Sequence, residues 1–415
     1  MDIRLFLRNE IRASWRSLAA IATVLALSLA LSISTMTLER SIRQSTAKAA
    51  DAFDLLVGAK GSSSALLLGS VFLRDESLSL MPASALKVAL NKGGVKWLAP
   101  LAFGDRIGTA PLVGTTEEMV TLGGTRSIAR GRTFHDINEA VVGATSGFNL
   151  GDKFHPEHGR VAGSGSSHQE VEFVVVGVLP KTGTPWDRAV LVPIQSVWTM
   201  HDHAHTHKEE QSEDILSAEA LARSSDDQLR ALPGFQSLVI KPSDFASAYR
   251  LRHRLARTTL EMENGQSVPL TAVFSGEVLV DLYGSLDTAG KVLYVVTYAS
   301  LAISLLAVVL FGLMLVHLRS PGLLTLRVMG APARYIVWVV WTLVMTVICW
   351  GAIGGFIFGQ AFAYVATVWI EQQTGIAMNV AVTAKEWMVC GMVILAGAVA
   401  ALVPALGVCR RTSLR

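Results

Sequence analysis

Four long apolar runs divide the chain. They cover residues 17–38, 292–318, 336–363 and 387–408, and none of them contains Asp, Glu, Lys or Arg. A helix of about 20 apolar residues crosses the hydrocarbon core of a bilayer, which is roughly 30 Å thick. The pattern therefore predicts four transmembrane helices. The second and third are long enough to tilt or to continue beyond the bilayer.

Basic residues are distributed unequally between the segments that flank these runs. Residues 1–16, 319–335 and 409–415 hold four, three and three arginines, whereas residues 364–386 contain only Lys385. Because short cytosolic flanks carry the excess of Lys and Arg, we expect both termini and residues 319–335 in the cytosol. Residues 1–16 fit either an amphipathic helix on the inner membrane surface, before a turn into the first span, or ordinary basic flanking. The first run is longer than the apolar part of a secretory signal peptide, which favours an uncleaved anchor.

Residues 39–291, which this orientation places outside, have the composition of a folded domain. They carry 25 basic and 29 acidic side chains and none of the three cysteines, and about 250 residues bury a core without disulfides. Apolar β-branched runs predict strands at 95–101, 111–113, 172–179 and 189–193. The succession 237–273 predicts a βαβ unit whose helix, 243–258, is capped by Ser243. A last helix is expected to run from about Gly276 into the second span. The predicted fold is an α-helical membrane protein with four transmembrane helices and a mixed α+β extracytoplasmic domain inserted between helices 1 and 2.

The cytosolic segment 319–335 has the punctuation of a short helix. Pro321 stands where a helix can begin, Gly330 where it can end, and Pro332 follows. The implied helix, residues 321–329, is about 13 Å long and too apolar to face water alone, so we expect it to dock into another protein. The coupling residues assigned to it and to its end are Arg319, Leu323, Leu324, Leu326, Arg327, Met329, Gly330 and Ala331.

Two of the apolar runs carry small residues at a spacing of four. In the first span these are Ala22, Ala26 and Ala30, and in the third they are Gly351, Gly355 and Gly359. Such stripes permit close approach of helices in a membrane. The partner of each stripe stays open at this stage, because it can be the same chain or a second copy.

One histidine tract is the only metal-like feature of the sequence. His201, His203, His205 and His207 alternate along the chain, so that an extended backbone points all four imidazoles the same way. Imidazole nitrogens are zinc ligands, but His-rich tracts also bind metal loosely through composition alone. Both a zinc site and a solvated loop with incidental affinity remain open.

Motifs for chemistry are otherwise missing. No Walker A motif is present, so ATP hydrolysis is not expected in this chain. Residues 143–147 resemble a nucleophile elbow only superficially, since Thr145 occupies the place of the nucleophilic serine, and a turn is the simpler interpretation. The charge balance gives no reason to expect nucleic acid as a partner. The absence of charges within the spans argues against an ion-coupled transporter.

The order of one span, a large outer domain and three further spans resembles the MacB/FtsX-type ABC permeases over the whole chain. Their cytosolic motif typically runs Arg-Glu-x-x-x-Leu-Arg-x-x-Gly-Ala. Leu326-Arg327-Val328-Met329-Gly330-Ala331 matches its second half, while Gly322 stands where the acid is usual. Residues 53–62, 113–116 and 183–193, followed by a His-rich loop, are similar to one bacterial subgroup. Some members of that subgroup are associated with metal homeostasis or lipoprotein traffic.

The resemblance implies a multi-pass protein of the bacterial inner membrane with a periplasmic domain. It implies a permease homodimer that binds two copies of a separate ABC ATPase, which holds ATP and Mg²⁺. It also implies mechanotransmission, in which ATP-driven motion reaches the periplasmic domain and acts on a lipoprotein, lipid, peptide or small molecule, with periplasmic or outer-membrane proteins as further partners. The alternatives are a membrane-anchored metal-binding or sensor protein without an ATPase and, less consistent with the residues, a membrane hydrolase.

Overall fold

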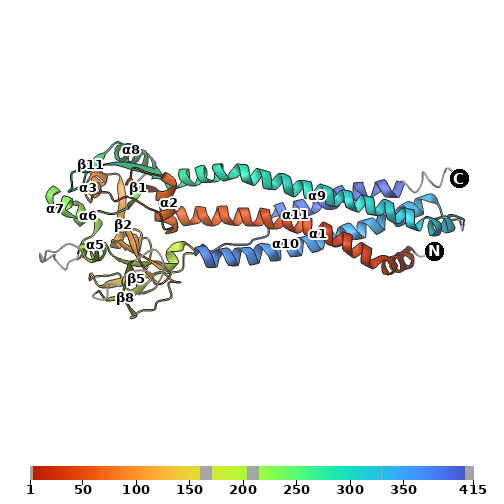
Figure 1. The fold of residues 1–415 in the computed structure, drawn as a ribbon, viewed down its shortest axis with the longest axis horizontal. Helices are drawn as coiled ribbons and strands as arrows, with labels where there is room; N and C mark the ends of the chain where they lie inside the picture. The colour runs from red at the N-terminus through yellow and green to blue at the C-terminus, as the bar shows by residue number, and fades with distance from the viewer. Residues whose placement is uncertain (1–2, 159–170, 203–214, 329, 407–415) are drawn as a thin grey trace. The chain divides into compact units, whose positions relative to one another are not determined.

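The computed structural model describes residues 3–158, 171–202, 215–328 and 330–406 (Figure 1). The chain divides into two compact units. The first contains Met1–Arg43, Leu286–Ile370 and Met378–Arg415, and the second contains Gln44–Ser285 and Glu371–Ala377. We call them the membrane unit and the outer unit.

Four long helices carry the predicted spans: α1 (Ile3–Ala50), α9 (Ser275–Val328), α10 (Ala333–Thr374) and α11 (Ala384–Ala400) (Figure 1). Within the described residues, each includes a stretch long and apolar enough to cross a membrane. Together with the sheet domain inserted after the first of them, they confirm the predicted fold class. The predicted helix from about Gly276 into the second span is also confirmed, because α9 runs through both regions.

One expectation about a helix boundary was wrong. Residues 321–328 do not form a separate helix that begins at Pro321, because α9 passes through Pro321 and ends at Val328. An internal proline removes one helical hydrogen bond and its ring crowds the carbonyl four residues earlier, which can bend a helix without ending it. Helix α1 is continuous from Ile3 through the first span, so the described part of residues 1–16 is helical.

The outer unit is built on a 12-stranded sheet with the order β11-β12-β1-β10-β2-β3-β9-β5-β8-β4, to which β6 and β7 add at β8 and β2. Its strands are β1 (Leu55–Ala59), β2 (Val95–Ile107), β3 (Ala110–Thr115), β4 (Arg130–Gly131), β5 (Glu139–Val142), β6 (Lys153–Phe154), β7 (Glu157–His158), β8 (Phe173–Val178), β9 (Val190–Pro193), β10 (Ser237–Pro242), β11 (Thr259–Glu261) and β12 (Ser267–Phe274). Its helices are α2 (Ser63–Phe72), α3 (Ala85–Leu90), α4 (Glu117–Thr121), η1 (Pro185–Arg188), α5 (Ile194–Asp202), α6 (Ala218–Ala222), α7 (Asp226–Ala231) and α8 (Phe245–Ala256).

The predicted βαβ unit is present in a split form. Strand β1 lies between β10 and β12 and pairs antiparallel with both, so β10 and β12 are parallel to each other. The expected cap was wrong by one residue. Asp244 caps α8, with an extended backbone (φ −153°, ψ 168°) and a carboxylate that accepts a hydrogen bond from Ser247 N at 2.9 Å. Asp244 is therefore the residue whose side chain faces the open N–H groups of the first turn.

Both faces of the sheet are buried, which explains the continuous apolar strands. Two apolar core clusters lie on opposite faces of the sheet. Leu55 and Val57 belong to the first and Leu56 to the second, because successive side chains of a strand point to opposite faces. The first cluster includes residues of α3, α6 and α8. The second includes Phe53, Trp186 and the end of α1, and it is the side on which the motifs of the outer unit meet.

Candidate functional site

The C-terminal end of α9 is followed by a turn at Gly330. Gly330 has φ +94°, a backbone conformation that favours glycine, and α10 begins three residues later. Ala331 packs against a cluster formed by Val316, Ile336, Val340 and Ala405. The turn is thus anchored on the membrane unit. Of the other predicted coupling residues, Arg319, Leu323, Leu324, Leu326 and Arg327 lie in the last turns of α9, and Met329 lies outside the described residues.

The two small-residue stripes meet each other within one chain. A Cβ added at Gly355 would lie 2.9 Å from the carbonyl oxygen of Ala26 and 2.8 Å from Leu29 Cβ. The equivalent positions at Gly351 and Gly359 would approach the carbonyl oxygens of Ala22 and Ala30 at 3.1 and 3.0 Å. Helices α1 and α10 therefore touch backbone to backbone along this line, and any larger residue on α10 would separate them.

A buried ion pair joins α1 to the N-terminus of α11. Arg40 Nη1 lies 2.5 Å from Glu386 Oε1, and the Glu386 side chain is fully buried. Glu386 also accepts hydrogen bonds from the Thr383 backbone N–H at 2.8 Å and from its hydroxyl, which makes a capping box for α11. The sequence prediction did not include this pair. A local signal exists only for the capping box, as Thr383-x-x-Glu386 directly before an apolar run, and it does not identify Arg40 as the partner.

In the outer unit, the 183–188 motif (Gly-Thr-Pro-Trp-Asp-Arg) is organised around the buried carboxylate of Asp187. This carboxylate accepts hydrogen bonds from the backbone N–H groups of Thr182 and Gly183 at 2.8 and 2.7 Å, and from the Thr182 hydroxyl at 2.6 Å. The guanidinium of Arg126 donates to the carbonyls of Val120 and Met119. Burial lowers the pKa of Arg126 to about 10, and the negative charge of Asp187 offsets part of that effect. Asp187 therefore fixes the loop and balances a buried cation.

The neighbours of this motif explain two observations from the sequence. The Trp186 ring lies 5.5 Å from the Phe53 ring and donates from Nε1 to Val71 O at 3.2 Å, so residues 53–62 and 183–193 meet in the core. Residues 143–147 form a turn against the same motif, with the Thr145 N–H donating to Asp187 O at 2.7 Å. This contact gives Thr145 a structural role, in agreement with the interpretation as a turn.

The motif also receives the end of α10. Arg188 donates through its two terminal nitrogens to the carbonyls of Gln372 and Gln373, at 3.2 and 3.3 Å. Beyond the helix, the Ala377 N–H donates to Gly183 O at 2.9 Å. A cation at the last carbonyls of a helix complements the negative end of its dipole. Segment Glu371–Ala377 is thus clamped by both ends of the 183–188 motif, which the sequence prediction used only as a family resemblance.

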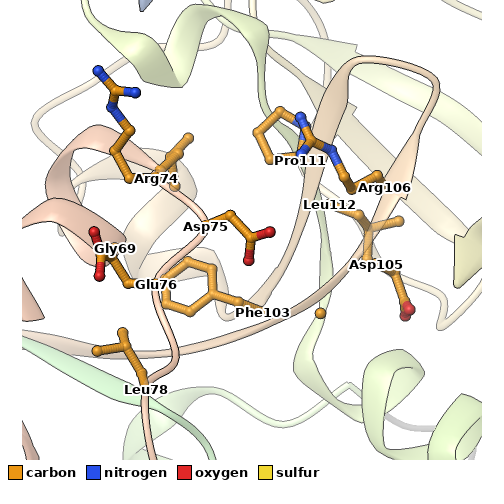
Figure 2. Close-up of a pocket in the computed structure, with 12 residues that line it drawn as sticks. Gly69, Arg74, Asp75, Glu76, Leu78, Phe103, Asp105, Arg106, Pro111 and Leu112 are labelled. Atoms are coloured by element: carbon orange, nitrogen blue, oxygen red, sulfur yellow. The ribbon is translucent and has the colours of Figure 1, made fainter. Parts of the chain in front are cut away.

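A small pocket lies between the segment after α2 and the β2–β3 hairpin (Figure 2). Its volume is about 80 Å³ and its lining includes Arg74, Asp75, Glu76, Asp105 and Arg106. Figure 2 shows the Asp75 carboxylate directed into the space beside the Phe103 ring. Charges of both signs line the pocket, and it is far smaller than the several hundred Å³ of most ligand sites. We assign it no ligand.

The predicted histidine site falls mostly outside the described residues. His201 lies in the last turn of α5, whereas His203, His205 and His207 lie in 203–214, which the structure does not describe. Within the described ranges, no three His, Cys, Asp or Glu side chains are grouped so that they could hold a metal ion. The zinc hypothesis therefore stays a prediction.

Comparisons with known proteins point to one family. The family model of the MacB-like periplasmic core domain matches residues 17–250. Among solved structures, the chain is similar to the extracellular domain of the noncanonic ABC-type transporter YknZ from Gram-positive bacteria. The identity is 12% and the TM-score 0.31, and the match covers 53% of this chain and 98% of that one. No curated protein matches the chain. Because the family model covers more than half of the sequence, the chain belongs to the MacB-like family and is a MacB/FtsX-type ABC transporter permease, a multi-pass membrane protein with an extracellular domain.

Proposed function

We propose that this permease passes the motion of a separate cytosolic ABC ATPase to its outer unit. That motion exports, extracts or remodels a substrate of the bacterial envelope, such as a lipoprotein, lipid, peptide or small molecule. The permease acts as a homodimer in the inner membrane with two ATPase subunits, which bind ATP and Mg²⁺. The outer unit lies in the periplasm, where it contacts periplasmic or outer-membrane proteins, and membrane lipid surrounds the four helices.

The observation that carries this proposal is that three helices contribute residues to both units. Helix α1 belongs to the membrane unit up to Arg43 and to the outer unit from Gln44. Helix α9 enters the membrane unit at Leu286, and α10 gives its last turn, from Glu371, to the outer unit. Because a helix keeps its hydrogen bonds along its whole length, a displacement at one end is carried along the axis. The Arg188 clamp on α10 supports the same role, since it holds the helix end on a rigid loop.

The ATPase end of this path is the turn after α9. Leu326 and Met329 are three residues apart in the sequence, a spacing that places two side chains on one face of a helix. Burial of such side chains in an ATPase cleft contributes about 1.5–3 kcal/mol each. Leu326→Asp replaces this gain with the cost of a desolvated carboxylate. Gly330→Val acts on the backbone instead, because φ +94° is strained for a β-branched residue.

The test is a pull-down of the ATPase together with the ATPase rate in reconstituted membranes. We expect Leu326→Asp to abolish copurification and Gly330→Val to retain partial binding with weaker stimulation. Leu150→Asp, the same change at an exposed leucine of the outer unit, is the control and leaves both readouts unchanged. Normal binding and normal stimulated turnover in Leu326→Asp would show that this segment is not the coupling element.

The orientation has a separate test. Cysteines introduced at Ser62 and Ser413, in a chain whose Cys349, Cys390 and Cys409 are replaced by Ala, are predicted to react with a membrane-impermeant maleimide from opposite sides. Ser62 reacts in intact cells with a permeabilised outer membrane, and Ser413 reacts only after the inner membrane is opened. Labelling of both from the same side would overturn the topology.

A further inference from the structure

A second, larger cavity lies in the outer unit and is not used by the contacts described above. It is an open groove of about 690 Å³ between the end of α1, the start of α8 and the start of α9. Its volume falls within the roughly 300–1,000 Å³ of small-molecule sites. All of its lining residues belong to the outer unit. Within the part of the chain that the structure describes, the outer unit alone therefore forms the groove.

One wall of the groove is a ladder of aromatic rings. Phe245 and Tyr249, one turn apart on α8, have ring centroids 5.0 Å apart, and Tyr249 lies 5.1 Å from Phe274. Phe245 is 79% exposed and Tyr249 47% exposed. The Arg252 guanidinium already lies over the Phe274 ring, 4.9 Å from its centroid. The inner end of the ladder thus holds a cation, while its outer rings remain available to another one.

The groove also has a one-sided charge. Among the described residues, four carboxylates line it, from Asp51, Asp54, Asp244 and Glu277, and no Lys or Arg does. Two of them are balanced from outside the lining, Asp54 by Lys241 at 2.8 Å and Glu277 by Arg252 at 2.7 Å. Asp51 and Asp244 carry the remaining negative charge, and the nearby positive charge of Arg250 offsets part of it at Asp244.

Asp244 is a permanent anion at neutral pH. Hydrogen bonds from the Ser247 hydroxyl and the Ser247 backbone N–H lower its pKa to about 2. Because Asp244 occupies the N-terminus of α8, the helix end is already satisfied by a carboxylate of its own chain. An external anion finds no free helix end here, whereas a cation meets both the carboxylates and the faces of the rings.

We infer that this groove binds small amphiphilic cations, in which an ammonium, guanidinium or phosphonium group is attached to an apolar body. The aromatic ladder takes the apolar body and stabilises the charge from its ring faces. The carboxylates exclude anionic amphiphiles of the same shape. That these cations are also the transported substrates rests on the proposed permease function, but their binding does not.

The experiment uses the full-length permease in nanodiscs of zwitterionic lipid, without ATPase or ATP. Tetraphenylphosphonium and tetraphenylborate are the probes, because they share a shape and differ in the sign of the charge. Binding is measured by equilibrium dialysis, with empty nanodiscs subtracted. We expect saturable binding of the phosphonium ion, at least tenfold tighter than any saturable binding of the borate.

The variants locate the site. Phe245→Ala is expected to weaken phosphonium binding about fivefold, equivalent to about 1 kcal/mol. Phe245→Tyr, which keeps an aromatic ring, is expected to bind the phosphonium ion as tightly as the unchanged chain. Asp51→Asn and Asp244→Asn should each weaken it about two- to threefold. Asp244→Asn is chosen because Asn caps a helix about as well as Asp. Leu150→Ala, at an exposed apolar residue outside the groove, is the matched control and leaves the affinity unchanged.

Three results would overturn the inference. One is equal binding of the two probes, and another is unchanged phosphonium binding in both Phe245→Ala and Tyr249→Ala. The third concerns a Val280→Cys variant. If two copies of it form a disulfide efficiently, and tetraphenylphosphonium does not lower the yield of that disulfide, a second copy of the chain fills the groove. Failure of ATPase coupling with normal phosphonium binding would count against the proposed function alone.

Discussion

Removal of Arg40 is predicted to leave a buried, unbalanced charge at the start of α11. The Glu386 side chain is fully buried, and its other hydrogen-bond donors, Thr37 and Thr383, are neutral. Breaking one partner of a buried ion pair costs about 3–5 kcal/mol. Protonation of Glu386 sets an upper limit on the cost of removing Arg40, because the carboxyl can become neutral instead of staying charged. Neutralising a carboxyl with an ordinary pKa of about 4.3 at pH 7 costs about 3.7 kcal/mol. We therefore expect Arg40→Met to lower the free energy of unfolding by about 3–4 kcal/mol.

A double-mutant cycle separates this charge effect from lost packing. Glu386→Gln keeps the bonds to Thr383, and Arg40, whose side chain is 19% exposed, can still reach water and the Ala381 carbonyl. This single change is expected to cost about 1–2 kcal/mol. In the double variant no charge is left unbalanced, so its loss should be smaller than the sum of the single losses by about 2 kcal/mol.

The assay is reversible unfolding in mixed micelles, followed by tryptophan fluorescence while the fraction of denaturing detergent is raised. Arg43→Met is the matched control on the same helix. Arg43 pairs with Glu39 at 3.0 Å, but the two side chains are 41% and 34% exposed, and a pair of this kind is worth at most about 1 kcal/mol. A loss below about 1 kcal/mol in Arg40→Met, or additive losses in the double variant, would refute the reasoning.

Two further predictions concern the stripes and the histidines. Gly355→Ala should destabilise the membrane unit by about 1–3 kcal/mol, because the new Cβ meets the Ala26 carbonyl. Gly391→Ala on α11 is the control and should not destabilise it, because a Cβ there meets nothing within 4 Å. Equal losses of unfolding free energy in the two variants would contradict the close packing of α1 and α10. Replacement of His201, His203, His205 and His207 together by Ala should lower zinc binding in calorimetry while folding and dimerisation persist. Unchanged zinc stoichiometry would exclude the site.

The features that the sequence predicted well are those with only one physical solution. A run of more than 20 residues without a charge, such as 336–363, has no alternative to a helix in a bilayer. The apolar strand 173–178 was expected to be buried, and Phe173, Val175 and Val178 lie in the core while Val174 and Val176 are half-buried. The glycine at 330 was expected to end a helix, and it has the positive φ that makes a glycine necessary there.

The features that were missed depend on residues far apart in the sequence. Nothing near Pro321 tells whether the preceding helix ends, because that depends on how α9 is supported by its neighbours. The cap of α8 is an exception, because Ser243 and Asp244 are neighbours that can both cap a helix, and the backbone of the turn after β10 selects Asp244. The pairing of Arg40 with Glu386 and of Arg188 with the end of α10 joins segments that are distant in sequence, and a pattern along one segment does not reveal such contacts.

The position of β1 has a consequence for the synthesis of the protein. Leu55 pairs with Ile240 on one side and with Phe274 on the other, so the strand that is made first lies between two of the last three to be made. At roughly 5–20 residues per second, β1 waits roughly 10–45 s for β12 after it leaves the ribosome. During this time both of its edges are open to pairing with other chains. The outer domain can close its sheet only when the residues next to α9 have been translocated, so its folding is a late event of membrane insertion.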